Sequence, residues 1–90
     1  YLSAEDRIEA PRLYQTLQWV REQIIAGATD FKAIEQSAMT ILNDNGWKPD
    51  YVAIRRQSDL LEPENGENVP LVILTAARLG TTRLIDNLEV

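Results

Sequence analysis

The sequence predicts an α+β domain in which two main helices, plus a short N-terminal helix, pack on a three-stranded antiparallel sheet. Two apolar stripes with helical spacing occupy the first half of the chain. An unbroken apolar run at residues 71–74 precedes a turn at Gly80 and Thr81, a pattern typical of a buried strand that opens a β-hairpin. Because the chain has 90 residues, we expect residues 1–90 to form a single domain.

A short helix near the N terminus is expected to end at about Glu9. Ser3 and Asp6 have the spacing of a capping box, in which a hydroxyl caps the helix and an acid occupies its third position. Pro11 fits only the first turn of a helix, because it has no backbone N–H and a fixed φ. We therefore expect a kink or break near Ala10 and a second helix that begins at Pro11.

The second helix should extend over residues 11–26 and stop at Gly27. Trp19 projects roughly 120° away from the apolar stripe of this helix, onto a polar face. Either the indole marks an interface with another surface, or a local segment such as residues 1–8 covers it. The stripe, with Tyr14 and Ile25 at its margins, consists of Leu13, Leu17, Val20 and Ile24.

The third helix should be capped by Thr29 or Asp30, whose side-chain oxygens can accept hydrogen bonds from free N–H groups of the first turn. Residues 43–46, Asn-Asp-Asn-Gly, form a strong stop signal and end it. Its apolar face, which should pack on the sheet beside the second helix, consists of Phe31, Ile34, Ala38, Ile41 and Leu42.

Three strands account for the second half of the chain. Residues 51–56 predict a half-buried strand, because their apolar side chains alternate onto one face. Residues 62–68 form an acidic, turn-rich loop, and we expect Leu60 and Leu61 to anchor its start. In the final hairpin the apolar run predicts a strand buried on both faces, whereas residues 83–88 predict a more exposed partner strand.

The composition limits the chemistry that this chain can perform by itself. It contains no histidine and no cysteine, which removes the commonest general base and the commonest metal ligands. A net charge of −5 argues against nucleic acid and anionic membranes as partners. No apolar run approaches the roughly 20 residues of a membrane span. The four glycines are isolated, so we expect no phosphate-binding loop, no catalytic residue and no metal site.

Arg78 and Arg83 are the residues most suggestive of binding. If the hairpin turn has two residues, these arginines lie directly opposite one another, which is unfavourable for like charges. Such a pair could receive an anion, either a phosphate or the carboxylate of a partner. The alternative is a longer loop with a shifted register, or neutralisation by Asp86 or Glu89. We favour this alternative, because loop length sets the register and the sequence does not reveal it.

Several segments share their order and spacing with a known enzyme family. The most specific is Ala-Ala-Arg-Leu-Gly at residues 76–80, followed by Thr-Arg-Leu-Ile-Asp-Asn at residues 82–87. The others are residues 1–7, 10–11 and 13–14, residues 26–27 with Asp30 and Ile34, and residues 54–55 with 59–61. Together they resemble the C-terminal domain of pantothenate synthetase, the pantoate–β-alanine ligase family. The resemblance covers essentially the whole chain.

The resemblance implies an adenylate-forming ligase that works in two steps. Pantoate attacks ATP, which magnesium accompanies, to give pantoyl adenylate and pyrophosphate; β-alanine then attacks the adenylate, and AMP and pantothenate are released. In this family the nucleotide-binding residues lie in an N-terminal Rossmann-type domain with a HIGH-type motif and a terminal Ser-Ser-Arg-Asn segment. None of these motifs occurs here. We therefore expect the C-terminal lid of a longer cytoplasmic ligase, without its N-terminal domain, inactive alone and binding no ATP or magnesium.

Two other functions stay open from the residues alone. A stand-alone protein-interaction module would use the face around Trp19 or the exposed edge of the hairpin. A nucleic-acid-binding domain is disfavoured by the negative net charge. The absence of Met at residue 1 favours a piece of a longer chain. Within such a lid, Arg78, Arg83 and Trp19 are the residues that we expect to contact substrate or the preceding domain.

Overall fold

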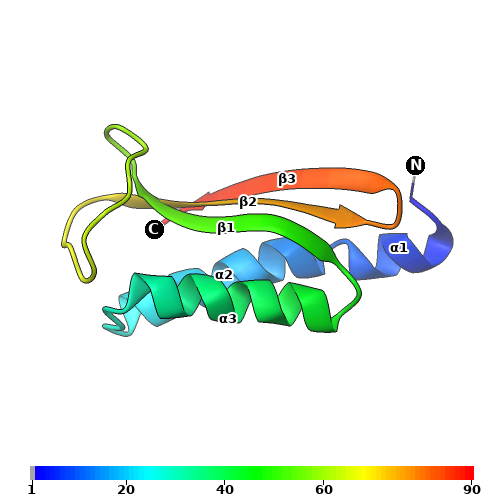
Figure 1. Cartoon of the computed structure of the whole chain (residues 1–90), viewed down its shortest axis with the longest axis horizontal. Coiled ribbons are helices and arrows are strands. Elements are labelled where there is room, and N and C mark those ends of the chain that lie inside the picture. The colour runs from blue at the N-terminus through cyan, green and yellow to red at the C-terminus, as the bar shows by residue number, and fades with distance from the viewer. Residues whose placement is uncertain (1) are drawn as a thin grey trace.

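A layer of helices covers one face of a three-stranded antiparallel sheet in the computed structural model, which describes residues 2–90 (Figure 1). The helical layer consists of α1 (Ala4–Glu9), α2 (Arg12–Ile25) and α3 (Phe31–Asp44). The sheet, in the order β1-β2-β3, consists of β1 (Lys48–Arg56), β2 (Leu71–Leu79) and β3 (Thr82–Glu89). The predicted α+β class and the predicted order of elements are therefore confirmed.

The three helices begin close to the positions expected from the capping residues and from Pro11. The Ser3 hydroxyl accepts a hydrogen bond from the Asp6 N–H at 3.1 Å. The Asp30 carboxylate accepts one from the Ala33 N–H, also at 3.1 Å. Each side chain thus satisfies a backbone donor that its helix leaves free. Pro11 occupies the N-cap position of α2, which begins at Arg12, and α1 ends at Glu9.

The hydrophobic core lies between the sheet and the apolar stripes of α2 and α3. α2 packs over β2 and β3, whereas α3 packs over β1. Trp47, between α3 and β1, is 1% exposed and belongs to the same cluster. Neither apolar stripe includes Trp47, so its burial was not predicted. The other fully buried members of the cluster include Leu17, Val20, Leu42, Ile54 and Ile73.

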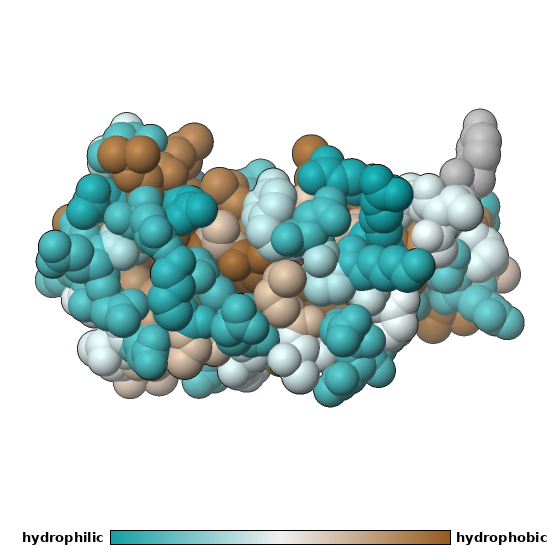
Figure 2. All heavy atoms as spheres, viewed as in Figure 1, coloured by the Kyte–Doolittle hydropathy of each residue, from teal (hydrophilic) through white to brown (hydrophobic). Residues whose placement is uncertain are grey.

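Four apolar residues that we expected in or near the core lie on the surface. Tyr14 and Ile25 are exposed because the helical layer buries only the centre of the α2 stripe. Leu60 and Leu61 are also exposed, and hydrophobic spheres gather over the loop between β1 and β2 (Figure 2). That loop is held by polar contacts instead, which include an ion pair between Arg56 and Glu67. The Leu60 N–H donates to the Arg56 carbonyl at 2.9 Å, and the Arg56 N–H donates to the Leu61 carbonyl at 3.0 Å.

The middle strand, β2, is buried on both faces although helices cover only one. Ala76 points to the uncovered face and is nevertheless fully buried. Arg83 of β3 reaches Asp50 of β1, with Nε and Oδ2 2.9 Å apart. Because β2 lies between these strands, the ion pair passes over it and helps to shield its outer face. Asp50 can do so because it occupies a bulge between Pro49 and Tyr51.

Candidate functional site at the end of the sheet beside α1

One end of the sheet brings together α1, the β2–β3 turn and the start of β1 (Figure 1). The turn consists of Gly80 and Thr81, because Leu79 pairs with Thr82. Gly80 has a φ of +61°, which side chains with a Cβ atom rarely adopt. A Cβ atom on Gly80 would also lie 2.7 Å from Asp6 Oδ2. The Asp6 side chain of α1 therefore lies beside the turn at Gly80.

Glu9 joins the other end of α1 to the core. The Trp47 Nε1–H donates to Glu9 Oε2 at 2.8 Å, and the Arg12 Nε–H donates to the same oxygen. Burial raises the pKa of the Glu9 carboxyl, but the hydrogen bonds from Arg12 and Trp47 and the charge of Arg12 outweigh it. The pKa is therefore lowered, and Glu9 is held as a carboxylate.

Ionised Glu9 should stabilise the fold only at sufficiently high pH. Because its pKa is lower in the folded protein, this contribution is complete above the ordinary value of 4.5 and is lost as the pH falls through the folded pKa. We expect Glu9→Gln to cost on the order of 1 kcal/mol at neutral pH, and less at an acidic pH well below 4.5. Urea denaturation of both proteins at the two pH values measures this cost. A cost that does not change with pH would contradict the assignment.

Arg78 and Arg83 lie directly opposite one another, so the alternative of a shifted register is wrong. Lys48 pairs with Arg78 from the other side, which makes a row of three cations across the three strands. Hydrophilic side chains accordingly cover this end of the sheet (Figure 2). Arg83 is neutralised by Asp50 of β1 and not by an acidic residue of β3. Among residues 2–90, no carboxylate lies within ion-pair distance of Arg78 or Lys48.

Trp19 is half-buried and belongs to the helical layer, on α2. It packs against the core cluster and lines a shallow pocket of about 190 Å³ together with Ile41 of α3. α3 therefore contributes to the surroundings of Trp19, which neither interpretation of the sequence included. Tyr1, which belongs to the arm expected to cover Trp19, lies outside the described residues. A contact of Trp19 with a second surface stays a prediction.

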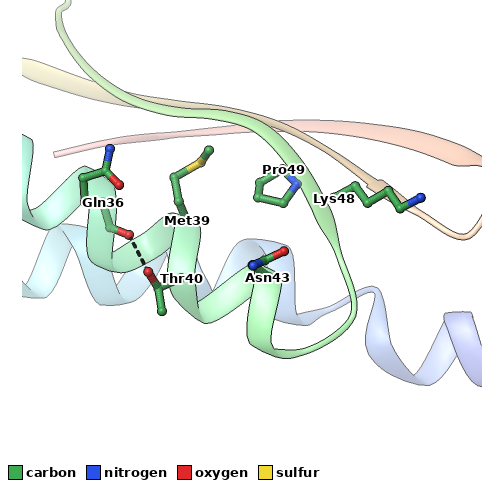
Figure 3. Close-up of a pocket in the computed structure, with 6 residues that line it drawn as sticks. All are labelled: Gln36, Met39, Thr40, Asn43, Lys48 and Pro49. Atoms are coloured by element: carbon green, nitrogen blue, oxygen red, sulfur yellow. Dashed lines mark hydrogen bonds between the residues drawn. The ribbon is translucent and has the colours of Figure 1, made fainter.

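A groove of about 460 Å³ lies between α3 and the start of β1 (Figure 3). The Thr40 hydroxyl on its wall donates to the Gln36 carbonyl at 3.1 Å. Lys48 contributes the one charged side chain of the lining, and it extends away from the α3 side chains. One cation among neutral groups does not form the converging set that a phosphate or metal site requires. The lining residues are Gln36, Met39, Thr40, Asn43, Lys48 and Pro49.

The described residues do not fit the magnesium and ATP that the resemblance implies for a whole enzyme. Throughout residues 2–90, no group of three or more acidic side chains is arranged to hold a metal ion. The four glycines have positive φ values in separate turns and form no common cradle for phosphates. In the same part of the chain, no helix has the length and apolar character needed to cross a membrane.

Comparison with known proteins places the whole chain in one family. A family profile described as pantoate-beta-alanine ligase matches residues 1–89. A crystal structure of pantoate-beta-alanine (pantothenate synthetase) from Thermus thermophilus is 33% identical, with a TM-score of 0.81, and the match covers 99% of this chain and 32% of that one. A second pantothenate synthetase structure from the same organism is 32% identical, with a TM-score of 0.84 and the same coverage.

This chain thus spans about a third of the length of those proteins and corresponds to their C-terminal part. The resemblance expected from the residues at 76–87 is confirmed by the family profile, which extends over nearly every residue of the sequence. The chain belongs to the pantoate–β-alanine ligase family.

Proposed function

We propose that this chain is the C-terminal lid of a longer, cytoplasmic pantoate–β-alanine ligase in which a preceding domain binds ATP and magnesium. The proposal rests mainly on the extent of the match, which spans 99% of this chain but only 32% of its relative. The chain contains no histidine, and its described part contains no acidic cluster that could hold a metal ion. The nucleotide chemistry is therefore assigned to the preceding domain, and this chain is assigned a role in closure.

A lid has a clear chemical purpose in such a reaction. Pantoyl adenylate, formed from pantoate and ATP, is an activated acyl group that water can hydrolyse before β-alanine arrives. A domain that closes over the site excludes water during this interval and holds the reactants together. The chain is suited to this task because it has its own core and a rigid sheet, and needs no catalytic group of its own.

The end of the sheet beside α1 is the surface that we assign to closure. The preceding domain would be joined through α1. The exposed cations Lys48 and Arg78 belong to the start of β1 and the end of β2, and these strand ends lie at the same end of the molecule as α1 (Figure 1). Arg78 is placed to meet a phosphate or carboxylate there, whereas Arg83 is already paired with Asp50. Trp19, on the helical layer, is assigned a contact with the preceding domain.

Deleting residues 1–90 from the longer ligase is the test of this function. We expect pantothenate formation to fall on the order of 100-fold, because the reactants are no longer enclosed. AMP release should fall less, since the adenylate still forms and is lost to water. The measurement is the ratio of AMP to pantothenate over a time course. Undiminished pantothenate formation by the shortened enzyme would exclude a lid role.

A matched binding experiment separates the lid from a self-sufficient nucleotide site. The 90-residue chain is titrated with magnesium–ATP and pantoate, and its amide signals are followed by NMR. We expect no saturable shift at micromolar concentrations, because the described residues provide no cradle for phosphates. Saturable shifts in this range would show that the chain binds nucleotide itself, and the division of labour proposed here would then be wrong.

A further inference from the structure

α1 is too short to be stable as an isolated helix. It has six residues, whereas an isolated helix in water is marginal even at roughly 12–15 residues. None of its residues is buried. Leu2 and Ala10, which flank it, pack against the core cluster. The helical state of α1 therefore depends on a small number of contacts with the rest of the molecule.

Glu9 and Asp6 make two of these contacts from one face of α1. The Glu9 carboxylate accepts the indole N–H of Trp47, which is buried at the junction of α3 and β1. The Asp6 carboxylate lies against Gly80 in the β2–β3 turn. Because residues three apart are neighbours on a helix surface, one face of α1 is bonded to the α3–β1 junction and also lies beside the β2–β3 turn.

The joint between α1 and α2 is itself helical. Ala10 has φ −50° and ψ −39°, and Pro11 has φ −59° and ψ −20°. The Ala10 N–H donates to the Asp6 carbonyl at 2.8 Å. Arg12 adds an ion pair with Glu9 across the joint. Since proline also restricts φ, this joint lacks the backbone freedom that a hinge requires.

We propose that Glu9 is a positioning residue of the ligase, holding α1 against the α3–β1 junction so that α1 and the sheet move as one rigid body. The inference rests on the lid function proposed above. α1 then connects the preceding domain to the sheet and sets the orientation of the sheet. The angle between α1 and the sheet determines how closely the lid covers the site. If α1 loses its hydrogen bond to Trp47, the closed position of the lid is poorly defined and water reaches the acyl adenylate.

The first experiment asks whether Glu9 holds α1, and it requires no ligase activity. Hydrogen exchange is followed at the Arg7 and Ala10 amides, which donate to carbonyls at the start and in the middle of α1. We expect Glu9→Ala to make both exchange on the order of tenfold faster, with the amides of β2 unchanged. Glu5→Ala is the matched control, because Glu5 lies in α1 and is exposed. Unchanged exchange in Glu9→Ala overturns the inference.

The second experiment measures AMP released per pantothenate by the full ligase. We expect Glu9→Ala to raise this ratio at least about twofold, and Glu5→Ala to leave it unchanged. Glu9→Gln should restore the ratio, because the glutamine oxygen still accepts from Trp47. If deletion of residues 1–90 raises the ratio and Glu9→Ala does not, the positioning role is overturned and the lid function stands. If the deletion does not raise the ratio, the lid function fails, whatever the exchange experiment shows.

Discussion

Replacing Leu17 by alanine should cost about 2–5 kcal/mol of the free energy of unfolding. Leu17 is 0% exposed and lies in the middle of the α2 stripe, within the core cluster. Truncation removes apolar contacts and leaves a cavity that α3 and the sheet can fill only in part. A domain of this size has a total stability on the order of 5–13 kcal/mol. The substitution should therefore remove a large share of it.

Gln18→Ala is the matched control for this substitution, because Gln18 is the next residue along α2 and is exposed. Its effect should stay within about 0.5 kcal/mol. Chemical denaturation of the two variants and the unchanged chain gives the comparison directly. Equal midpoints for Leu17→Ala and Gln18→Ala would contradict the assignment of which α2 side chains face the sheet.

Gly80→Val should destabilise the domain by about 2–3 kcal/mol. Gly80 has a φ of +61°, which is strained for any residue with a Cβ atom and most of all for a β-branched one. The new side chain would also displace Asp6, whose Oδ2 lies 2.7 Å from the position of the added Cβ. For a domain of this length, we expect the melting temperature to fall by roughly 10 °C or more.

Thr81→Val tests whether this loss belongs to the backbone of the turn. Thr81 is exposed and is not among the described residues with positive φ, so valine fits there without backbone strain. A positive φ at the first turn residue alone is the pattern of a type II′ turn, which needs glycine only at that position. Thermal unfolding should therefore place Thr81→Val close to the unchanged chain. Comparable melting temperatures for the two valine variants would contradict this turn type.

The features that could be predicted from the sequence are those that neighbouring residues determine. Three local features, the Ser3 cap, the N-cap of α2 at Pro11 and the turn at Gly80, each depend on backbone groups within three or four residues. The central strand was predictable because an unbroken apolar run has no polar face to expose. Interactions between neighbouring residues were therefore enough to predict the order of the helices and strands and most of the positions where they begin and end.

The features that were not predicted depend on residues far apart in the sequence, or on an interruption in the alternation of side chains along a strand. Glu9 and Trp47 are 38 positions apart, and no spacing rule relates them. The bulge at Asp50 interrupts the alternation of β1, so the strand begins at Lys48 and not at residue 51 as expected. Leu60 is apolar yet exposed, because the apolar surface of a small domain exceeds what its core can hold.

The outer edges of the sheet also decide whether further chains can add to it. On β1, Pro49 has no N–H to donate and Asp50 leaves the regular ladder. On β3, charged residues recur along the strand, at Arg83, Asp86 and Glu89. Charges, proline and bulges at an edge oppose the pairing of strands from separate molecules. We therefore expect the isolated chain to resist the edge-to-edge strand pairing that leads to fibres.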